Sequence, residues 1–403
     1  MPKFAVLSHV LIPSSSGQAT ALYRILSGVD PKDYYVINSP EALHEEFDGT
    51  HRQLQLGAAV YALPVEPPSG LQHWPPRRDL KTIYRLARQI YSRMKSILRV
   101  LRQEPDSTAV IACTANLINI PAAFLASRIA RKSFYAYIFD DFVFQWTGVH
   151  RQLAKLVAPI IFGFSRGIIG PNEFICEEYE RRYHVRSVLV RNPIELRELN
   201  TGSARPWPSE NGRIRIVYTG AVYHANLDCF VNLVNAMRNL PEFHLELHVF
   251  TAQTNALEAH GIESAHVLVH SYLDHEEILE EQRNADILFL PLAFKSPIPE
   301  VIRTSAPGKM GQYLASGRPI LAHVPADSFV QYYLHAHRCG FVADADDPDL
   351  LAAEIKRLVG DPGMRAEFIR NAQEQVRLDF SQTMARDNLL AFLGQDSGVK
   401  VLP

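Results

Sequence analysis

Residues 304–321 (TSAPGKMGQYLASGRPIL) contain the side chain and the turn best suited to hold a phosphate. Pro307 and Gly308 end a loop, Lys309 lies in the first turn of a short predicted helix, and Gly317 matches the end of that helix. A helix N-terminus presents free N–H groups and a positive dipole end, and a lysine there adds a full charge. The pattern suits a diphosphate, and it equally suits an ordinary loop–helix–strand unit with a solvated lysine.

Two carboxylates follow an apolar strand in the first half of the chain. Asp140 and Asp141 come directly after the apolar residues 134–139. A carboxylate at a strand end could orient a substrate hydroxyl or take its proton. The two residues could instead cap a turn or a helix that follows the strand.

No metal site is predicted. Asp344 and Asp346 form a D-x-D pair, a spacing that binds a metal ion in some enzymes. Asp347 and Pro348, which follow, are typical of the N-cap and first position of a helix. We therefore interpret this segment as a strand end followed by a helix start.

Strand-like and helical segments alternate in both halves of the chain, which is typical of β–α–β units with a parallel sheet. A polar stretch at 196–212, with prolines and glycines, interrupts the alternation and is predicted to be a linker. We predict an α/β fold in which residues 1–195 and 213–380 form two Rossmann-like, doubly wound domains. A last helix within 381–403 is expected to pack back toward the first domain. Ligands of such sheets bind at the carboxyl ends of the strands.

The composition is that of a globular chain with two domains, since the 403 residues are 47% hydrophobic and 21% charged. The net charge of −2 argues against non-specific nucleic-acid binding. The four cysteines lie far apart, which predicts reduced thiols and a cytoplasmic protein. No apolar run approaches the about 20 residues that a membrane-spanning helix needs.

Several segments are similar to GT-B glycosyltransferases, specifically to family 4-like enzymes. The stretch KMGQYLASGRPIL resembles the family pattern K-x-x-E-Y-L-A-x-G-[KR]-P-[VI]. Segments that resemble other blocks of the family follow in the family's order at 214–220, 271–292 and 341–353. The resemblance implies the GT-B fold, with an acceptor-binding first domain and a nucleotide-sugar-binding second domain facing each other across a cleft.

The resemblance also implies roles for single residues of the second domain. Lys309 falls where the family holds the diphosphate, and Gly220 would let the backbone approach a phosphate closely. The two glutamates of the family motif fall on Thr304 and Gln312, which bears on how the donor sugar is held. An amide can hydrogen-bond a ribose diol, but it lacks the charge of a carboxylate. The other residues expected to line the nucleotide site are Thr251, Tyr272, Arg303, Ser305, Pro307 and Gly308.

In the first domain, the resemblance places Asp140 where relatives carry a His or Asp near the reacting sugar, with Asp141 as the second choice. Ser16 and Gly17 end the loop SSSG, where relatives approach the acceptor or the donor phosphate. That loop is too short to count as a phosphate-binding loop by its sequence alone.

Residues 77–102 form a basic amphipathic stretch with nine Lys or Arg and one acid, Asp79. An apolar stripe at helical spacing predicts a helix that packs on the core and presents a solvated basic face. Alternatively, the basic face could make peripheral contact with an anionic membrane at its cytoplasmic side.

The function predicted from these patterns is a glycosyltransferase of the hexosyltransferase kind (EC 2.4 class). It would move a sugar from a UDP- or GDP-type nucleotide sugar to a carbohydrate, lipid-linked or small-molecule acceptor, with retention and without a metal or a cofactor. Two alternatives stay open. The chain could be a non-catalytic GT-B module that partners an active transferase, or it could be a nucleotide-sugar 2-epimerase.

Overall fold

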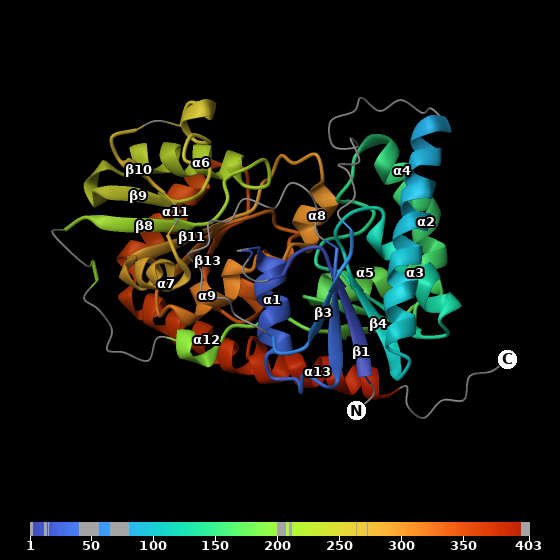
Figure 1. Cartoon of the computed structure of the whole chain (residues 1–403). Coiled ribbons are helices and arrows are strands. Elements are labelled where there is room, and N and C mark those ends of the chain that lie inside the picture. Colours follow the sequence, from blue (N-terminus) through green and yellow to red (C-terminus); the bar gives the residue numbers. More distant parts are fainter. Residues whose placement is uncertain are drawn as a thin grey trace. The chain divides into compact units, whose positions relative to one another are not determined.

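The computed structural model of the chain describes residues 3–11, 14, 16–39, 56–64, 80–199, 207–208, 212–262, 264–271 and 273–395 (Figure 1). The chain divides into two compact units. The first unit comprises Met1–Pro193 together with Gln382–Pro403, and the second comprises Ile194–Ser381. The predicted linker at 196–212 therefore opens the second unit, and its residues 200–206 and 209–211 lie outside the described residues.

The first unit is built on a sheet of seven parallel strands in the order β3-β2-β1-β4-β5-β6-β7. The chain runs outward from β1 to β3 and then returns to β4, so the strand order reverses between β1 and β4. Open α/β sheets bind ligands beyond the carboxyl ends of the strands at such a switch point. The strands are β1 (Lys3–Ser8), β2 (Tyr34–Asn38), β3 (Ala59–Ala62), β4 (Ser107–Cys113), β5 (Ser133–Tyr137), β6 (Gly167–Gly170) and β7 (Ser187–Leu189).

Helices cover both faces of this sheet. They are α1 (Gly17–Leu26), α2 (Leu80–Gln103), α3 (Asn119–Ile129), α4 (Gly148–Gly163), α5 (Glu173–Tyr183) and α13 (Gln382–Gly394). Successive strand residues point to opposite faces. In β1, Phe4 and Val6 join the core under α1 and α13, whereas Ala5 and Leu7 join the core under α2 to α5.

The C-terminal helix α13 packs within the first unit, against α1 and β7. Its Phe392 ring lies 5.7 Å from the ring of Tyr135 in an edge-to-face arrangement. A Cβ atom on Gly167 would lie 2.4 Å from the Phe392 ring, so the glycine of β6 leaves the space that this ring fills.

The second unit repeats the plan with six parallel strands in the order β10-β9-β8-β11-β12-β13. The strands are β8 (Ile214–Thr219), β9 (Leu245–Phe250), β10 (Val267–His270), β11 (Ile287–Pro291), β12 (Ile320–His323) and β13 (Phe341–Ala343). The helices are α6 (Leu227–Arg238), α7 (His275–Asn284), α8 (Pro299–Thr304), α9 (Lys309–Ala315), α10 (Phe329–Ala336), α11 (Pro348–Gly360) and α12 (Pro362–Asp379), with short 3-10 turns at Leu196–Glu198, Pro241–Phe243 and Glu258–His260. Here the strand order reverses between β8 and β11.

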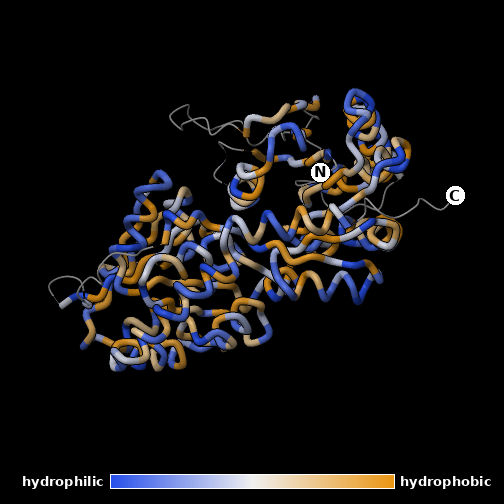
Figure 2. Tube along the Cα trace, turned by 90° about the horizontal axis from the view of Figure 1, so that it is seen from below, coloured by the Kyte–Doolittle hydropathy of each residue, from blue (hydrophilic) through white to orange (hydrophobic). Residues whose placement is uncertain are grey.

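The predicted α/β class with doubly wound parallel sheets is confirmed. In Figure 2, hydrophobic and hydrophilic residues alternate along the helices, as expected of helices that pack by one side. Gly317, with a φ of +74°, ends α9 as its position in the sequence predicts. The short strand β3 was not predicted, because its four residues lie at the sheet edge and three of them are exposed. All four cysteines are buried and free.

Candidate functional site

The carboxyl edge of the second sheet brings together residues that are 89 positions apart in the sequence. Gly220 directly follows β8, and Lys309 begins α9. Gly220 has a φ of +128°, a conformation that residues with a side chain rarely adopt. A Cβ atom on Gly220 would lie 2.7 Å from the Lys309 Nζ atom. Only glycine therefore allows the lysine ammonium to lie against this turn.

The ammonium of Lys309 is held by Tyr218, the next-to-last residue of β8. Lys309 Nζ donates a 2.7 Å hydrogen bond to Tyr218 Oη and lies 3.9 Å from the centre of the tyrosine ring. The lysine is partly buried, and its withdrawal from water lowers its pKa to about 7. An anion that arrived at this edge would restore the charged form.

Tyr218 is itself fixed by two further contacts. Its hydroxyl donates to the carbonyl oxygen of Ala221 at 2.5 Å and accepts from Asn226 Nδ2 at 2.9 Å. The sequence did not single out Tyr218 or Asn226. The alternating apolar pattern of the strand predicts that Tyr218 is an ordinary core residue. No local pattern connects its hydroxyl to a lysine in another element.

A second tyrosine holds α9 against β8. Tyr313 Oη accepts a 3.0 Å hydrogen bond from the Thr219 backbone N–H, which is otherwise at the end of its strand. Gln282 of α7 donates to Thr219 Oγ1, also at 3.0 Å. Burial raises the pKa of Tyr313 to about 12, so this phenol stays neutral. These buried contacts set where the first turn of α9 lies relative to Gly220.

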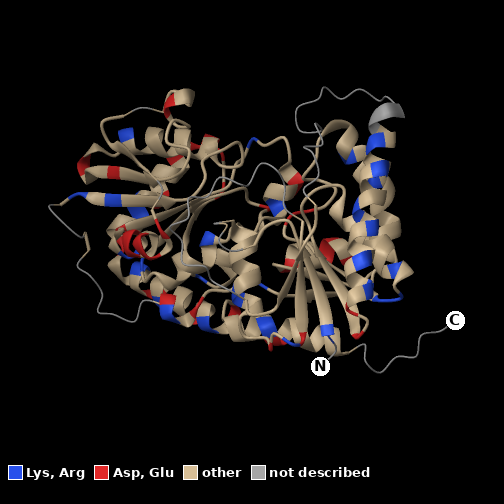
Figure 3. Ribbon diagram, in the orientation of Figure 1, with Lys and Arg blue, Asp and Glu red and all other residues tan. Residues whose placement is uncertain are grey.

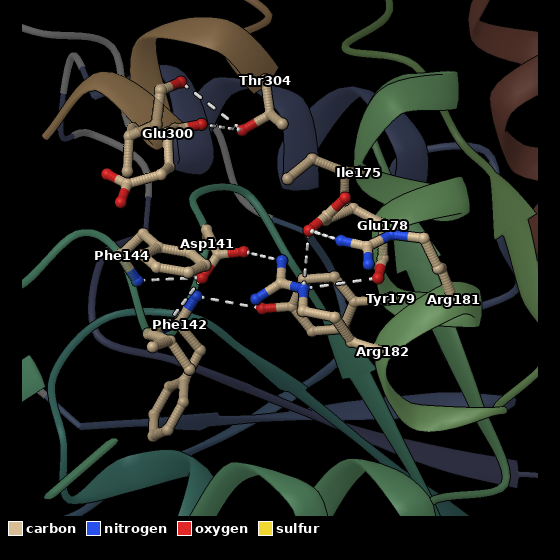
Figure 4. A network of polar contacts seen from close by, with 12 residues as sticks. Asp141, Phe142, Phe144, Ile175, Glu178, Tyr179, Arg181, Arg182, Glu300 and Thr304 are labelled. Carbon is tan, nitrogen blue, oxygen red and sulfur yellow. Dashed lines mark hydrogen bonds and ion pairs between the residues drawn. The ribbon is translucent and has the colours of Figure 1, made fainter. Parts of the chain in front are cut away.

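The two positions that replace the family glutamates have different settings. Gln312 lies one turn after Lys309 on α9, is partly buried, and its amide makes no hydrogen bond within the described part of the chain. It can therefore face a ligand. Thr304 is buried at the end of α8, and its hydroxyl donates to the carbonyl oxygen of Glu300 at 3.1 Å (Figure 4). This back-bond within the helix favours a structural role for Thr304.

The remaining predicted nucleotide-site residues are less clearly assembled. Thr251 follows β9 and is buried, and its hydroxyl donates to Gln253 Oε1 at 3.0 Å. Arg303 is exposed on α8, and its Nε atom lies 4.0 Å from a carboxylate oxygen of Asp327. Ser305, Pro307 and Gly308 form the connection from α8 to α9.

Tyr272, which was also predicted to line this site, lies outside the described residues.

In the first unit, Asp141 has the contacts of a structural residue (Figure 4). It is 1% exposed, and its Oδ1 atom accepts from the backbone N–H groups of Val143 and Phe144 at 2.8 and 2.9 Å. Its Oδ2 atom forms an ion pair with Arg182, which also contacts Glu178 at 3.1 Å. Both carboxylate oxygens are occupied, so these contacts favour the turn-capping interpretation over the catalytic one.

Asp140, one residue earlier, has the opposite setting. Its side chain is exposed, and its backbone N–H donates to Thr114 Oγ1 at 3.3 Å. Its carboxylate makes no hydrogen bond within the described part of the chain. It follows β5 at the carboxyl edge of the first sheet, so it is the better placed of the two aspartates to meet a ligand.

Ser16 and Gly17 lie at the same edge, at the start of α1. Ser16 is the N-cap, and its hydroxyl accepts from the Ala19 backbone N–H at 3.1 Å. A Cβ atom on Gly17 would meet no atom within 4 Å, so packing within the protein does not require glycine there.

The D-x-D segment is arranged as a helix start. Asp346 pairs with Lys295 at 2.7 Å and accepts from Asn232 at 2.9 Å, while Asp347 caps α11 through the Asp349 N–H. Within the described ranges, no group of three or more His, Cys, Asp or Glu could hold a metal ion.

Comparison with known proteins gives a family match and a common fold. Residues 213–361 match the family model described as glycosyl transferases group 1. No curated protein sequence matches the chain.

Solved structures match over nearly the whole length. Sucrose-phosphate synthase from Thermosynechococcus elongatus is 14% identical with a TM-score of 0.71, over 98% of this chain and 99% of that one. A UDP-forming trehalose-phosphate synthase from Burkholderia xenovorans is 13% identical with a TM-score of 0.71, over 99% and 100% of the chains. Anabaena HepE in complex with UDP-glucose is 14% identical with a TM-score of 0.66, over 98% and 99%.

At these identities the solved structures establish the fold, while the family match covers most of the second unit. Both glycine–lysine partners, Gly220 and Lys309, lie within the matched residues. The chain therefore has the GT-B fold, and its residues 213–361 match the glycosyl transferases group 1 family, as the sequence predicts.

Proposed function

We propose that the protein transfers a sugar from a UDP-type nucleotide sugar to an acceptor hydroxyl, with retention of configuration and without a metal. The observation that carries the proposal is the Lys309 ammonium, which lies against Gly220 at the carboxyl edge of the second sheet. A neutral or weakly charged lysine at this edge gains its full charge when a diphosphate binds. It then stabilises the negative charge that grows on the leaving diphosphate.

The choice of donor follows two of the structural relatives. HepE is in complex with UDP-glucose, and the trehalose-phosphate synthase is described as UDP-forming. Gln312, one turn from Lys309 with an amide that can face a ligand, is proposed to hydrogen-bond the ribose hydroxyls. Asp140 is proposed to orient the acceptor hydroxyl or to take its proton.

The acceptor is proposed to be a carbohydrate, a lipid-linked glycan or a small molecule. A lipid-linked acceptor would require contact with a membrane surface. Residues 77–102 are proposed to make that contact. Of these, 77–79 lie outside the described residues, and the others belong to α2.

A second candidate function is a non-catalytic GT-B module that partners an active transferase. The specific observation in its favour is Thr304, whose hydroxyl is bonded to its own helix where the family carries a glutamate. This reading predicts weak or absent nucleotide binding. A nucleotide-sugar 2-epimerase is separated from both readings by product analysis without an acceptor.

Lys309→Ala tests the main proposal. UDP at 100 times its Kd should stabilise the wild-type chain by about 2.7 kcal/mol, since a ligand that binds only the folded state raises its stability. For a unit of this size that corresponds to a rise in Tm of about 5–10 °C. Thermal unfolding with UDP, GDP, ADP and CMP measures it. UDP should shift the wild type by this amount and the variant by much less, whereas no shift of the wild type by any nucleotide would favour the non-catalytic module.

The affinity for UDP should fall as the pH rises above 7. The pKa of Lys309 is about 7 in the free protein, so the lysine is mostly neutral at higher pH. Binding of the diphosphate must then be coupled to uptake of a proton by the lysine. The phosphate itself, with a pKa of about 6, is already ionised in this range. The Kd should rise by up to about tenfold between pH 8 and 9 in calorimetric titrations. With Lys309→Ala the Kd should be weaker and independent of pH, and a parallel pH dependence of both proteins would contradict the assignment.

Gly220→Ala should reduce both stability and nucleotide affinity. The new Cβ would displace the Lys309 ammonium, and the positive φ adds strain of about 1–3 kcal/mol. Gly261→Ala is the matched control, because Gly261 also has a positive φ, +69°, but no atom within 4 Å of its Cβ position. Both variants should unfold at lower temperature, and only Gly220→Ala should weaken UDP binding. Equal UDP affinities in the two variants would argue against the close approach.

Asp140→Asn and Asp141→Asn should have different effects. Asp140→Asn removes an exposed carboxylate, so it should change stability by less than about 0.5 kcal/mol and lower turnover by about 10²–10⁴-fold. Asp141→Asn leaves the Arg182 cation without its buried partner, so it should cost about 3 kcal/mol of stability. Thermal unfolding and turnover are measured on both. Full activity in Asp140→Asn would remove it from the proposed chemistry.

A further inference from the structure

Three helices of the first unit share one face of its sheet and have sides that no other described element covers. The helices α2, α3 and α4 pack on the same core, and α3 contacts both of the others. We use "the α2–α4 face" for their solvent-exposed residues. The membrane contact considered above concerns α2 alone, whereas this face extends over all three helices.

The charge of the α2–α4 face is of one sign. The sequences of the three helices contain no Asp or Glu. Among the side chains whose exposure the structure describes, the exposed cations are five on α2, one on α3 and one on α4, namely Arg85, Arg88, Lys95, Arg99, Arg102, Arg128 and Lys155. Figure 3 shows the blue cations of α2 with no acid between them. The first acids after α2 lie beyond its end, and one of them, Glu104, is paired with Lys3 at 2.7 Å.

The same face carries large apolar side chains in the open. On α4, and just after it, Leu156, Ile160 and Phe164 are 72%, 58% and 66% exposed. They are spaced four residues apart and therefore lie along one side of the helix. On α3, Leu125 and Ile129 are also exposed. On α2, Tyr84 and Tyr91 are exposed among the cations.

Neither feature alone would indicate a partner. Single exposed apolar residues are common, and basic helix faces are usually solvated. Here, however, an apolar row on α4 and a field of cations without acids on α2 occur on two helices that both contact α3. A protein partner with an apolar patch would account for the apolar row and not for the excess of cations. An anionic lipid surface accounts for both, because cations attract its headgroups while apolar and aromatic side chains enter the headgroup region.

We propose that the α2–α4 face binds the surface of an anionic membrane, with Leu156, Ile160 and Phe164 inserted at the headgroup level. Among the described helices, none combines the length and the apolarity needed to cross a bilayer. The binding is peripheral and reversible. It should weaken as the ionic strength rises, because salt screens the attraction between the cations and the anionic headgroups. The proposal does not depend on transferase activity, so it stands or falls separately from the proposed function.

Sedimentation of the full chain with lipid vesicles tests the proposal. One set of vesicles is made of phosphatidylcholine alone, and the other contains 30% phosphatidylglycerol, on the order of the anionic content of a cytoplasmic leaflet. The wild type should sediment with the anionic vesicles and remain in solution with the neutral ones. Arg88→Gln with Arg99→Gln should lower the partition coefficient about fivefold for each cation removed. Leu156→Gln with Ile160→Gln should lower it at least about tenfold without changing the charge of the face.

Matched controls lie on the second unit. Leu350→Gln replaces a leucine of α11 that is 49% exposed, and Arg370→Gln removes an exposed cation of α12. Neither should change vesicle binding, and unchanged Tm values should show that all variants are folded. Equal sedimentation with both kinds of vesicle, or binding that the Leu156 and Ile160 changes leave intact, would overturn the proposal. The proposal would also be overturned if the chain failed to bind vesicles but formed a concentration-dependent dimer that the Leu156 and Ile160 changes abolish. The face would then join two copies of the chain.

Discussion

The candidate site depends on a missing atom. Gly220 carries no Cβ, and the space that a Cβ would fill is taken by the Lys309 ammonium. The same glycine turns β8 into the following loop at a positive φ. The absence of a side chain thus has two effects at one position, since it permits both the backbone turn and the approach of a cation. The chemistry proposed for the second unit requires both.

The lysine would be of little use if α9 were free to shift. Its position is set by buried hydrogen bonds between β8, α7 and α9, in which Thr219 contacts both Tyr313 and Gln282. Tyr218 does the same for the ammonium itself. A network of this kind is costly unless its members are bonded, and when bonded it specifies one arrangement. Burial lowers the pKa of this lysine to about 7, so an arriving anion would favour its charged form.

In the first unit, two adjacent aspartates follow the end of β5 and have different surroundings. Asp141 is buried in bonds to Arg182 and to two backbone N–H groups, and it shapes the turn after β5. Asp140 is left at the surface beside it. The α2–α4 face of the same unit presents cations and apolar side chains together. Both observations come from the same architecture, in which Asp140, proposed to meet the acceptor, follows a strand end and the helices present their outer sides to the surroundings.

The sequence by itself determined the class of fold, the two sheets and the positions of most elements. Apolar residues recur at every second position in a half-buried strand and about every 3.6 positions in an amphipathic helix. The local order of apolar residues therefore indicates the type of element and the side that is buried. The lysine at a helix start is a local signal that singled out Lys309, whereas Gly220 and Gln312 were singled out by the resemblance to the family. Only the tertiary structure decided which hydroxyl holds the lysine, which of two adjacent aspartates is buried, and that the Thr304 hydroxyl is bonded to its own helix. It also placed the exposed row of α4 on the same face as the cations of α2. The physical reason is that hydrogen-bond partners, ion pairs and shared faces join elements far apart in the sequence, and no local pattern encodes which elements meet.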